Sequence, residues 1–296
     1  MYINFGNNLN KLNHFIGRKL FKNDNLFTYN IYNFISDFKK RNNFVKGHWV
    51  ENFHRLGYSE LGFVSENLMS DLSKEIDKQS PQINDTYRYD FVATAELQKI
   101  IKKICYQELD KYLKDLSIYY GSKIAFSNFN FRRTYGFNSK NQKEEEFFSE
   151  NWHCDTYLNT FCKLFINISD VDVENGPTHI LSKKNTKNFI KKNKYIDRTN
   201  HESNEAIDAF KNTGKKGKIL ICNTTQCLHK AGIPEVNSTR DMLIVALVIN
   251  KKFNDYFYFE KEFKNYLWSS EKISISYLAK KYSKPSGIKN LIKNLF

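Results

Sequence analysis

The chain has 296 residues, of which 41% are hydrophobic, with 25 Phe and 18 Tyr. That much apolar and aromatic surface can form a large packed interior, which excludes a disordered protein. The net charge is +14, but the lysines are scattered along the chain, and no aromatic-basic strand motif typical of nucleic-acid binding occurs. A β barrel with helical additions can reach this length as one unit, so we expect a single domain over residues 1–296.

Residues 1 to about 120 are expected to be mainly helical. In Glu66–Lys78 and Ala95–Leu116, apolar residues recur three and four positions apart, which is the spacing of one helix face. No chemical motif occurs in this part of the chain.

From Ile124 the pattern changes to short β-prone runs, which predict a β core over residues 124–250. The runs are Ile124–Tyr135, Thr160–Ser169, Lys218–Cys222 and Met242–Asn250. Asn175-Gly176-Pro177 is the clearest turn between them, because Asn-Gly supplies positive φ angles. Residues 254–296 again favour helix, with one apolar stripe formed by Ile288, Leu291, Ile292 and Leu295.

The cysteines and the apolar runs bear on the compartment. The five cysteines include no CxxC pair, and residues 1–19 lack the continuous apolar segment of a signal peptide. Both features favour thiols in a reducing cytoplasm. The longest apolar run, Met242–Ile249, is far shorter than the roughly 20 residues that span a bilayer, so we expect no transmembrane segment.

The densest basic stretch runs from Lys183 to Lys194. A solvated helix or loop face is the simpler interpretation. The alternative is an anion-binding patch, which would suit an anionic substrate.

Trp152-His153-Cys154-Asp155 places a histidine and an aspartate two positions apart, and on a strand such residues point to the same face. Imidazole and carboxylate are suitable ligands of Fe(II), and two histidines with one carboxylate leave three octahedral positions open. Such a short motif also occurs by chance, as a hydrogen-bonded polar pair. By alternation, Cys154 would point away from the metal.

His229 is followed by Gly232, Pro234 and Asn237, and then by Arg240. These residues suggest a reversal near 234–235 that would place His229 and Arg240 opposite each other on paired antiparallel strands. A guanidinium binds a carboxylate through two parallel hydrogen bonds, so Arg240 could hold a carboxylate of a molecule bound to the metal. Without the histidines, a rim arginine would be the better interpretation.

Taken in order, these motifs resemble the phytanoyl-CoA dioxygenase (PhyH-like) family of Fe(II) and 2-oxoglutarate-dependent oxygenases. The resemblance covers roughly Phe131 to Ile249, and its segments are Trp152–Asp155, Lys163–Pro177, Ile180–Ser182, and His229 with Arg240. It implies a double-stranded β-helix, a cupin-like jelly-roll barrel, with helical flanks. It also implies that Arg240 binds the C5 carboxylate of 2-oxoglutarate and that Fe(II) is bound by His153, Asp155 and His229.

Three further residues match positions that contact the co-substrate or face its pocket in such enzymes: Lys163, Asn130 and Thr134. Each could equally be an ordinary polar residue of a strand. The implied activity is hydroxylation of a C–H bond by O2, coupled to conversion of 2-oxoglutarate into succinate and CO2. The main alternative is a catalytically silent barrel that serves as a binding or scaffold protein.

Two departures from the family pattern concern the pocket rather than the metal ligands. Leu181-Ser182-Lys183-Lys184-Asn185 stands where the family usually has a Pro-Gly-Ser-His segment, and Ala231 stands where relatives often have a hydroxyl. The substrate is therefore left open as a small or carrier-linked metabolite, such as a sugar, a nucleotide-linked group or an acyl chain.

Overall fold

The computed structural model describes residues 49–79, 86–92, 94–120, 124–136, 151–155, 162–192 and 208–249, and two short strands at 257–259 and 272–274. Within these residues, eight strands form a large sheet, in the order β1-β7-β4-β9-β3-β2-β11 with β10 paired to β3. Their bounds are β1 Tyr58–Phe63, β2 Thr86–Asp90, β3 Ile124–Tyr135, β4 Cys162–Asn167, β7 Lys218–Cys222, β9 Thr239–Ile249, β10 Phe257–Phe259 and β11 Lys272–Ser274. All pairings are antiparallel except that of β10 with β3.

A second, smaller sheet has the order β6-β5-β8, with bounds β5 His179–Ile180, β6 Phe210–Lys211 and β8 His229–Lys230. His153 extends this sheet through an antiparallel bridge to His229. Between β3 and β9 the chain passes repeatedly from one sheet to the other. In this part of the chain, β3, β4, β7 and β9 belong to the large sheet. The segments between them, namely the His153 segment, β5 with β6, and β8, belong to the small sheet.

The two sheets share an apolar interior. Ile180 of the small sheet belongs to the same buried cluster as Phe165, Leu220 and Met242 of the large sheet, and Phe210 packs against that cluster. Successive residues of a strand point to opposite faces, so the neighbours of these residues, such as Leu164 and Leu243, face the other way. Those neighbours belong to a different cluster, on the outer face of the large sheet.

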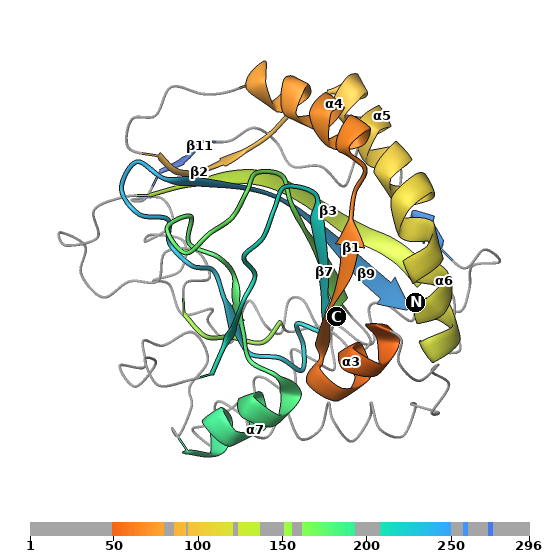
Figure 1. Cartoon of the computed structure of the whole chain (residues 1–296), viewed down its shortest axis with the longest axis vertical. Coiled ribbons are helices and arrows are strands. Elements are labelled where there is room, and N and C mark those ends of the chain that lie inside the picture. The colour runs from red at the N-terminus through yellow and green to blue at the C-terminus, as the bar shows by residue number, and fades with distance from the viewer. Residues whose placement is uncertain are drawn as a thin grey trace, which may run out of the picture.

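Helices cover that outer face. They are α3 (Trp49–Leu56), α4 (Glu66–Asp77), and a run of α5 (Ala95–Lys103), the π-helix η2 (Ile104–Leu109) and α6 (Asp110–Tyr120). Figure 1 shows α4 beside α5, with α6 continuing the run along the same face of the sheet, and α7 (Lys183–Lys192) on the opposite side of the molecule. Burying a Leu or Phe side chain stabilises a fold by about 1.5–3 kcal/mol, so this shared cluster ties the helices firmly to the sheet.

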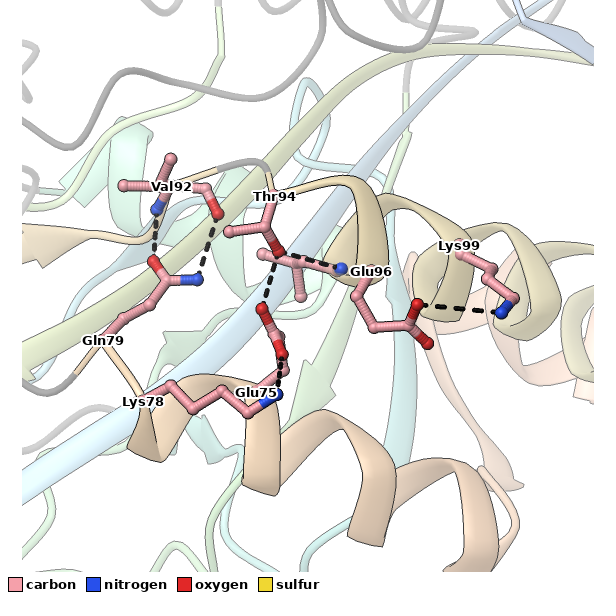
Figure 2. A network of polar contacts seen from close by, with 8 residues as sticks. Glu75, Lys78, Gln79, Val92, Thr94, Glu96 and Lys99 are labelled. Atoms are coloured by element: carbon pink, nitrogen blue, oxygen red, sulfur yellow. Dashed lines mark hydrogen bonds and ion pairs between the residues drawn. The ribbon is translucent and has the colours of Figure 1, made fainter.

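A polar network holds the end of β2 against α4 and α5 (Figure 2). Thr94, at the N-cap of α5, accepts a hydrogen bond from the Leu97 backbone N–H at 3.1 Å and donates one to Glu75 Oε1 at 2.7 Å. The side chain of Gln79 pairs with both the N–H and the carbonyl of Val92. Hydrogen bonds from Lys78 and Thr94 lower the pKa of the Glu75 carboxyl, because they stabilise its charged form.

The predicted elements of the core are confirmed closely. β3 and β7 have the predicted bounds, β4 and β9 lie on the predicted runs, and α4 and α5–α6 lie on the predicted helices. The structure thus has an antiparallel β core with helical flanks. Among the described residues before 121, helices predominate and β1 and β2 are added to them. The C-terminal region, predicted to be helical, contains β10 and β11.

These four short strands were not predicted because they gain their hydrogen bonds by pairing with strands of the existing sheet rather than from a strong local pattern. Their residues, such as Phe257-Tyr258-Phe259, still have high β propensity. The predicted apolar stripe at 288–295 lies outside the described residues.

The basic stretch forms α7, in which Lys184, Lys187 and Lys191 are exposed while Phe189 and Ile190 are buried. This is the pattern of a solvated helix face, the simpler of the two interpretations. No helix in the described part of the chain is both long and apolar enough to cross a membrane. The five cysteines, all of them described, form no disulfide.

Candidate metal centre

His153, Asp155 and His229 converge between the two sheets. One ligand atom from each can be chosen so that all three lie within 4.8 Å of one another. The backbone of His153 pairs with that of His229 through two hydrogen bonds, of 3.1 and 2.9 Å, and the imidazole ring centroids lie 4.2 Å apart. This bridge brings together two histidines that are far apart in the sequence.

Strand alternation places Asp155 on the same side as His153. The backbone N–H of Asp155 donates to the carbonyl of Thr224 at 2.8 Å, which anchors the residue to the loop before β8. Trp152 and Cys154, the alternate residues, instead join an apolar cluster with Leu181, Phe189, Ile190 and Leu228. Cys154 therefore packs away from the triad, as alternation predicts.

Backbone carbonyls orient both imidazoles. His153 Nδ1 lies 2.9 Å from the carbonyl oxygen of Asn151, and His229 Nδ1 lies 3.0 Å from that of Cys227. A carbonyl oxygen only accepts hydrogen bonds, so each Nδ1 carries the proton and each Nε2 presents a lone pair. In metal-binding histidines, the ring nitrogen that does not bind the metal commonly donates to a carbonyl oxygen in this way, which fixes the orientation of the ring.

The aspartate is held in its charged form. Burial alone would raise the pKa of the Asp155 carboxyl, but the ammonium group of Lys163, at 2.7 Å, holds that pKa well below its usual range. Asp155 Oδ2 also lies 3.9 Å from His229 Nε2. Two ligand bonds of about 2.1 Å to one ion place their ligand atoms about 3 to 4 Å apart, so this separation suits a shared metal.

Arg240 lies on β9, is only 5% exposed, and donates from Nη1 to the carbonyl of Gly232 at 3.2 Å. The prediction that His229 and Arg240 lie on paired strands is wrong. In the described strands, β8 pairs with β5, whereas β9 pairs with β3 and β4, so the two residues belong to different sheets.

The reason lies in the turn at 175–177. Gly232 N–H donates to Pro177 and Glu235 N–H donates to Glu174, so the backbone after β8 pairs with this turn rather than with β9. Gly176 has φ +64°, and a Cβ there would lie 2.3 Å from the carbonyl carbon of Ile233. Only glycine allows so close an approach. The chain then reverses at Asn237, whose φ is 70°, and enters the large sheet.

The three weaker candidates lie at different places on the inner face of the large sheet. Lys163 contacts the triad through Asp155. Thr134 is buried and is the cross-strand partner of Arg240. Asn130, on the same face of β3, accepts a hydrogen bond from Arg132 Nε. The structure therefore brings Lys163 to the triad and Thr134 to Arg240, and it places Asn130 beside another arginine.

Apolar side chains line the space between these groups. Met242 and Ile244 follow Arg240 at alternate positions of β9, so the three share one face. Met242 and Ile244 pack in the cluster that contains Phe165 and Ile180. Ile180 is the strand partner of His229. The triad and Arg240 thus border the same apolar interior between the two sheets.

Several residues of this region were not identified from the sequence. The carbonyls of Asn151, Thr224 and Cys227 position the triad, but any residue type can supply a carbonyl. Arg88, Asp90 and Arg132 are buried on the inner face as well. The sequence held one signal for Arg132. It lies two residues from both Asn130 and Thr134, and residues two apart on a strand point to the same face.

No family model and no curated protein matches the chain. Among solved structures, it is similar to SnoN, a non-heme alpha ketoglutarate dependent epimerase from nogalamycin biosynthesis, with 12% identity and a TM-score of 0.48 over 68% of this chain and 82% of that one. It is also similar to EctD from S. alaskensis, solved with 2-oxoglutarate and 5-hydroxyectoine, with 13% identity and a TM-score of 0.48 over 71% and 78%. The non-heme monooxygenase ThoJ, in a Ni complex, gives 11% identity and a TM-score of 0.45 over 84% and 100%.

Proposed function

We propose that this chain is an Fe(II) and 2-oxoglutarate-dependent dioxygenase that uses O2 to hydroxylate a C–H bond of a small or carrier-linked metabolite. The observation that carries the proposal is the convergence of His153, Asp155 and His229, with their ligand atoms within 4.8 Å, beside an apolar interior that also borders a buried arginine. A facial set of two histidines and one carboxylate is typical of non-heme Fe(II) oxygenases.

The proposed fold is a double-stranded β-helix of the jelly-roll type over residues 124–250, within a single oxygenase domain that spans residues 1–296. Support comes from the strand order. From β3 to β9 the chain alternates between two sheets that enclose one apolar cluster, and a jelly roll is a pair of facing antiparallel sheets connected in this way.

The residues present fit the proposed metal and co-substrate. Both Nε2 atoms present lone pairs, Asp155 is ionised, and the three groups give one negative charge, which suits a divalent ion. Arg240 has the fork of N–H donors that matches a carboxylate, and Lys163 adds a second positive charge beside the triad. We assign Arg240 to the C5 carboxylate of 2-oxoglutarate, with Lys163, Thr134 and Asn130 as further pocket residues.

When bound, iron and 2-oxoglutarate supply the oxidising chemistry, in which O2 is reduced, 2-oxoglutarate becomes succinate and CO2, and one oxygen atom enters the substrate. The chain supplies position and environment. Arg240 orients the bound co-substrate, because a guanidinium and a carboxylate form two parallel hydrogen bonds in one plane. Lys163 stabilises the negative charge of Asp155. Phe165, Ile180, Met242 and Ile244 keep water from the reacting groups.

An anaerobic titration tests this proposal. Adding Fe(II) and then 2-oxoglutarate to the full chain should produce the weak visible charge-transfer band of the chelate, and Asp155→Ala should abolish that band. The matched control is Asp241→Asn, since Asp241 pairs with Arg133 on β3 and no contact joins it to the triad. Absence of the band in the folded wild-type protein would favour a catalytically silent barrel instead.

A further inference from the structure

Helix α7 differs in its charges from the helices on the other side of the molecule. Five of its ten residues are lysines and none is acidic. Helices α5 and α6 carry both signs and pair them along their own length, Lys99 with Glu96 and Lys114 with Asp110. Because α7 has no acidic residue, it cannot form such pairs within itself. Its positive charge is left for a group outside the helix.

The exposed lysines of α7 lie along one face. They are Lys184, Lys187 and Lys191, which we call the lysine stripe, and Asn188 is exposed beside them. Residues three and four positions apart share a helix face, and at 1.5 Å per residue the stripe is roughly 10 Å long. Like charges at this spacing repel one another and destabilise a helix. A local cost of this kind is typical of a functional surface.

The buried face of α7 packs against the residues next to the candidate metal centre. Phe189 lies in one apolar cluster with Trp152 and Leu228, and each of these two directly precedes a histidine of the triad. The Phe189 and Trp152 ring centroids are 6.2 Å apart. The hydroxyl of Thr186 accepts a hydrogen bond from the backbone N–H of Leu228 at 3.0 Å. These contacts hold α7 on the outer face of the small sheet, with the lysine stripe pointing away from that sheet.

The outer face of the small sheet extends the basic surface. Lys211, His179 and Lys230 are strand partners, so they form one row across β6, β5 and β8. The ammonium group of Lys230 lies 5.2 Å from the ring centroid of Trp152, which places the row beside α7. Burial first, and then Lys230, Lys211 and Arg240, lower the pKa of His179 to about 4. Every charged group that shifts this pKa is basic, as expected on a positively charged surface.

One acidic residue lies at the edge of this surface. Asp208 is exposed, and its backbone carbonyl accepts a hydrogen bond from the Asn185 side chain at 3.2 Å. This contact places Asp208 beside the first turn of α7, where a negative charge is favoured by the helix dipole. The lysines in the middle and the last turn of the stripe lie further along the helix.

The residues of the stripe favour a protein as the partner. Its exposed face offers lysines and an asparagine, without an aromatic ring on which a base could stack or an apolar side chain that could enter a bilayer. Carboxylates three and four positions apart on a second helix would match three lysines at the same spacing. Complementary charged faces of this kind steer two proteins together and fix their register.

We propose that the lysine stripe of α7 is a docking surface for a protein that presents an acidic helix face. The proposal goes beyond the proposed oxygenase function and does not depend on it. A partner on α7 would bind to the outer side of the small sheet. The apolar interior between the sheets, on which the triad faces, would remain free for substrate.

The probe is a labelled helical peptide that carries glutamates at positions i, i+3 and i+7, and its glutamine counterpart is the control peptide. Binding to the full chain is measured by fluorescence anisotropy at about 0.05 M salt, where surface charges are weakly screened. We expect the glutamate peptide to bind. The triple variant Lys184→Gln, Lys187→Gln and Lys191→Gln should weaken its binding roughly tenfold, as for three exposed ion pairs.

The matched control variant is Lys99→Gln, Lys103→Gln and Lys111→Gln. It removes the same charge from exposed positions of α5 and α6, on the opposite side of the molecule from α7. This variant should bind the glutamate peptide nearly as tightly as the wild type. Equal losses in the two triple variants would show that the peptide responds to net charge alone, and would overturn the proposal.

Two further measurements test the place and the class of the partner. A carbodiimide joins a lysine to a carboxylate in contact with it, so cross-links from the peptide to the wild-type chain should lie at Lys184, Lys187 and Lys191. Cross-links confined to other lysines, or no binding of the glutamate peptide, would overturn the proposal. It is also overturned if oligothymidine or phosphatidylglycerol vesicles bind the wild type more tightly than the peptide does and lose affinity in the α7 variant.

Discussion

Replacing Arg240 with leucine should weaken 2-oxoglutarate binding while leaving iron binding nearly unchanged. Leucine keeps part of the apolar volume beside Met242 but removes the buried guanidinium. Truncating one partner of a buried, hydrogen-bonded charge pair costs about 2 to 5 kcal/mol. At 1.4 kcal/mol per factor of ten, the dissociation constant of 2-oxoglutarate should rise roughly 30- to 4,000-fold. Burial of Arg240 at 5% exposure favours the upper part of this range.

Two anaerobic titrations measure this separation. The charge-transfer band as a function of 2-oxoglutarate concentration gives the affinity for the co-substrate. Tryptophan fluorescence as a function of Fe(II) gives the affinity for the metal, because Trp152 directly precedes His153. Arg133→Leu serves as the control, since it removes a half-buried arginine that pairs with Asp241 at 2.7 Å. An unchanged midpoint for 2-oxoglutarate, or an equal loss of iron affinity, would refute the assignment of Arg240.

Three further predictions concern the triad, the turn at residues 175–177 and the helical flank. Asp155→Ala should abolish turnover in a product assay while the chain stays folded, because it removes a proposed ligand and no apolar core side chain. Gly176→Ala should lower the free energy of unfolding in urea by at least about 1–2 kcal/mol, since its φ is +64° and its Cβ would meet the backbone of Ile233; a neutral effect would contradict this account of the turn. The lowered pKa of Glu75 means that its stabilising effect is complete above the ordinary carboxyl range and is lost as the pH falls through its folded-state pKa. Thr94→Val should therefore destabilise the protein more at pH 7 than at pH 3, and an equal loss at both would show that the hydroxyl does not act through the Glu75 carboxylate.

The core strands could be predicted because their sequences carry the burial pattern. β7, Lys-Ile-Leu-Ile-Cys, is buried throughout and appears as a continuous apolar run, and β9 contains the longest such run in the chain. β2 was missed for the opposite reason. Its Thr-Tyr-Arg-Tyr-Asp sequence places Arg88 and Asp90 on one face, and such a face normally contacts solvent. Only the assembled sheet shows that both residues are buried.

The candidate site could be predicted in its residue types but not in its connections. The spacing of His153 and Asp155 is enough to place both on one face of a strand. The strand that carries their partner His229 could not be predicted from periodicity, because β5, β6 and β8 have only two residues each. The error over His229 and Arg240 arose because a reversal signal fixes where a chain turns, and not which sheet it enters afterwards.

The arrangement of the two sheets explains how short strands can hold a precise site. The three proposed ligands lie on the His153 segment and β8, whose own backbone pairing is limited to a few hydrogen bonds. Each ligand is nevertheless fixed at a second point: Asn151 and Cys227 carbonyls hold the imidazoles, and Thr224 holds the Asp155 backbone. Residues 222–229 are all buried, so this loop cannot shift without disturbing the interior. The rigidity of the centre therefore comes from packing against the large sheet, which also carries Arg240.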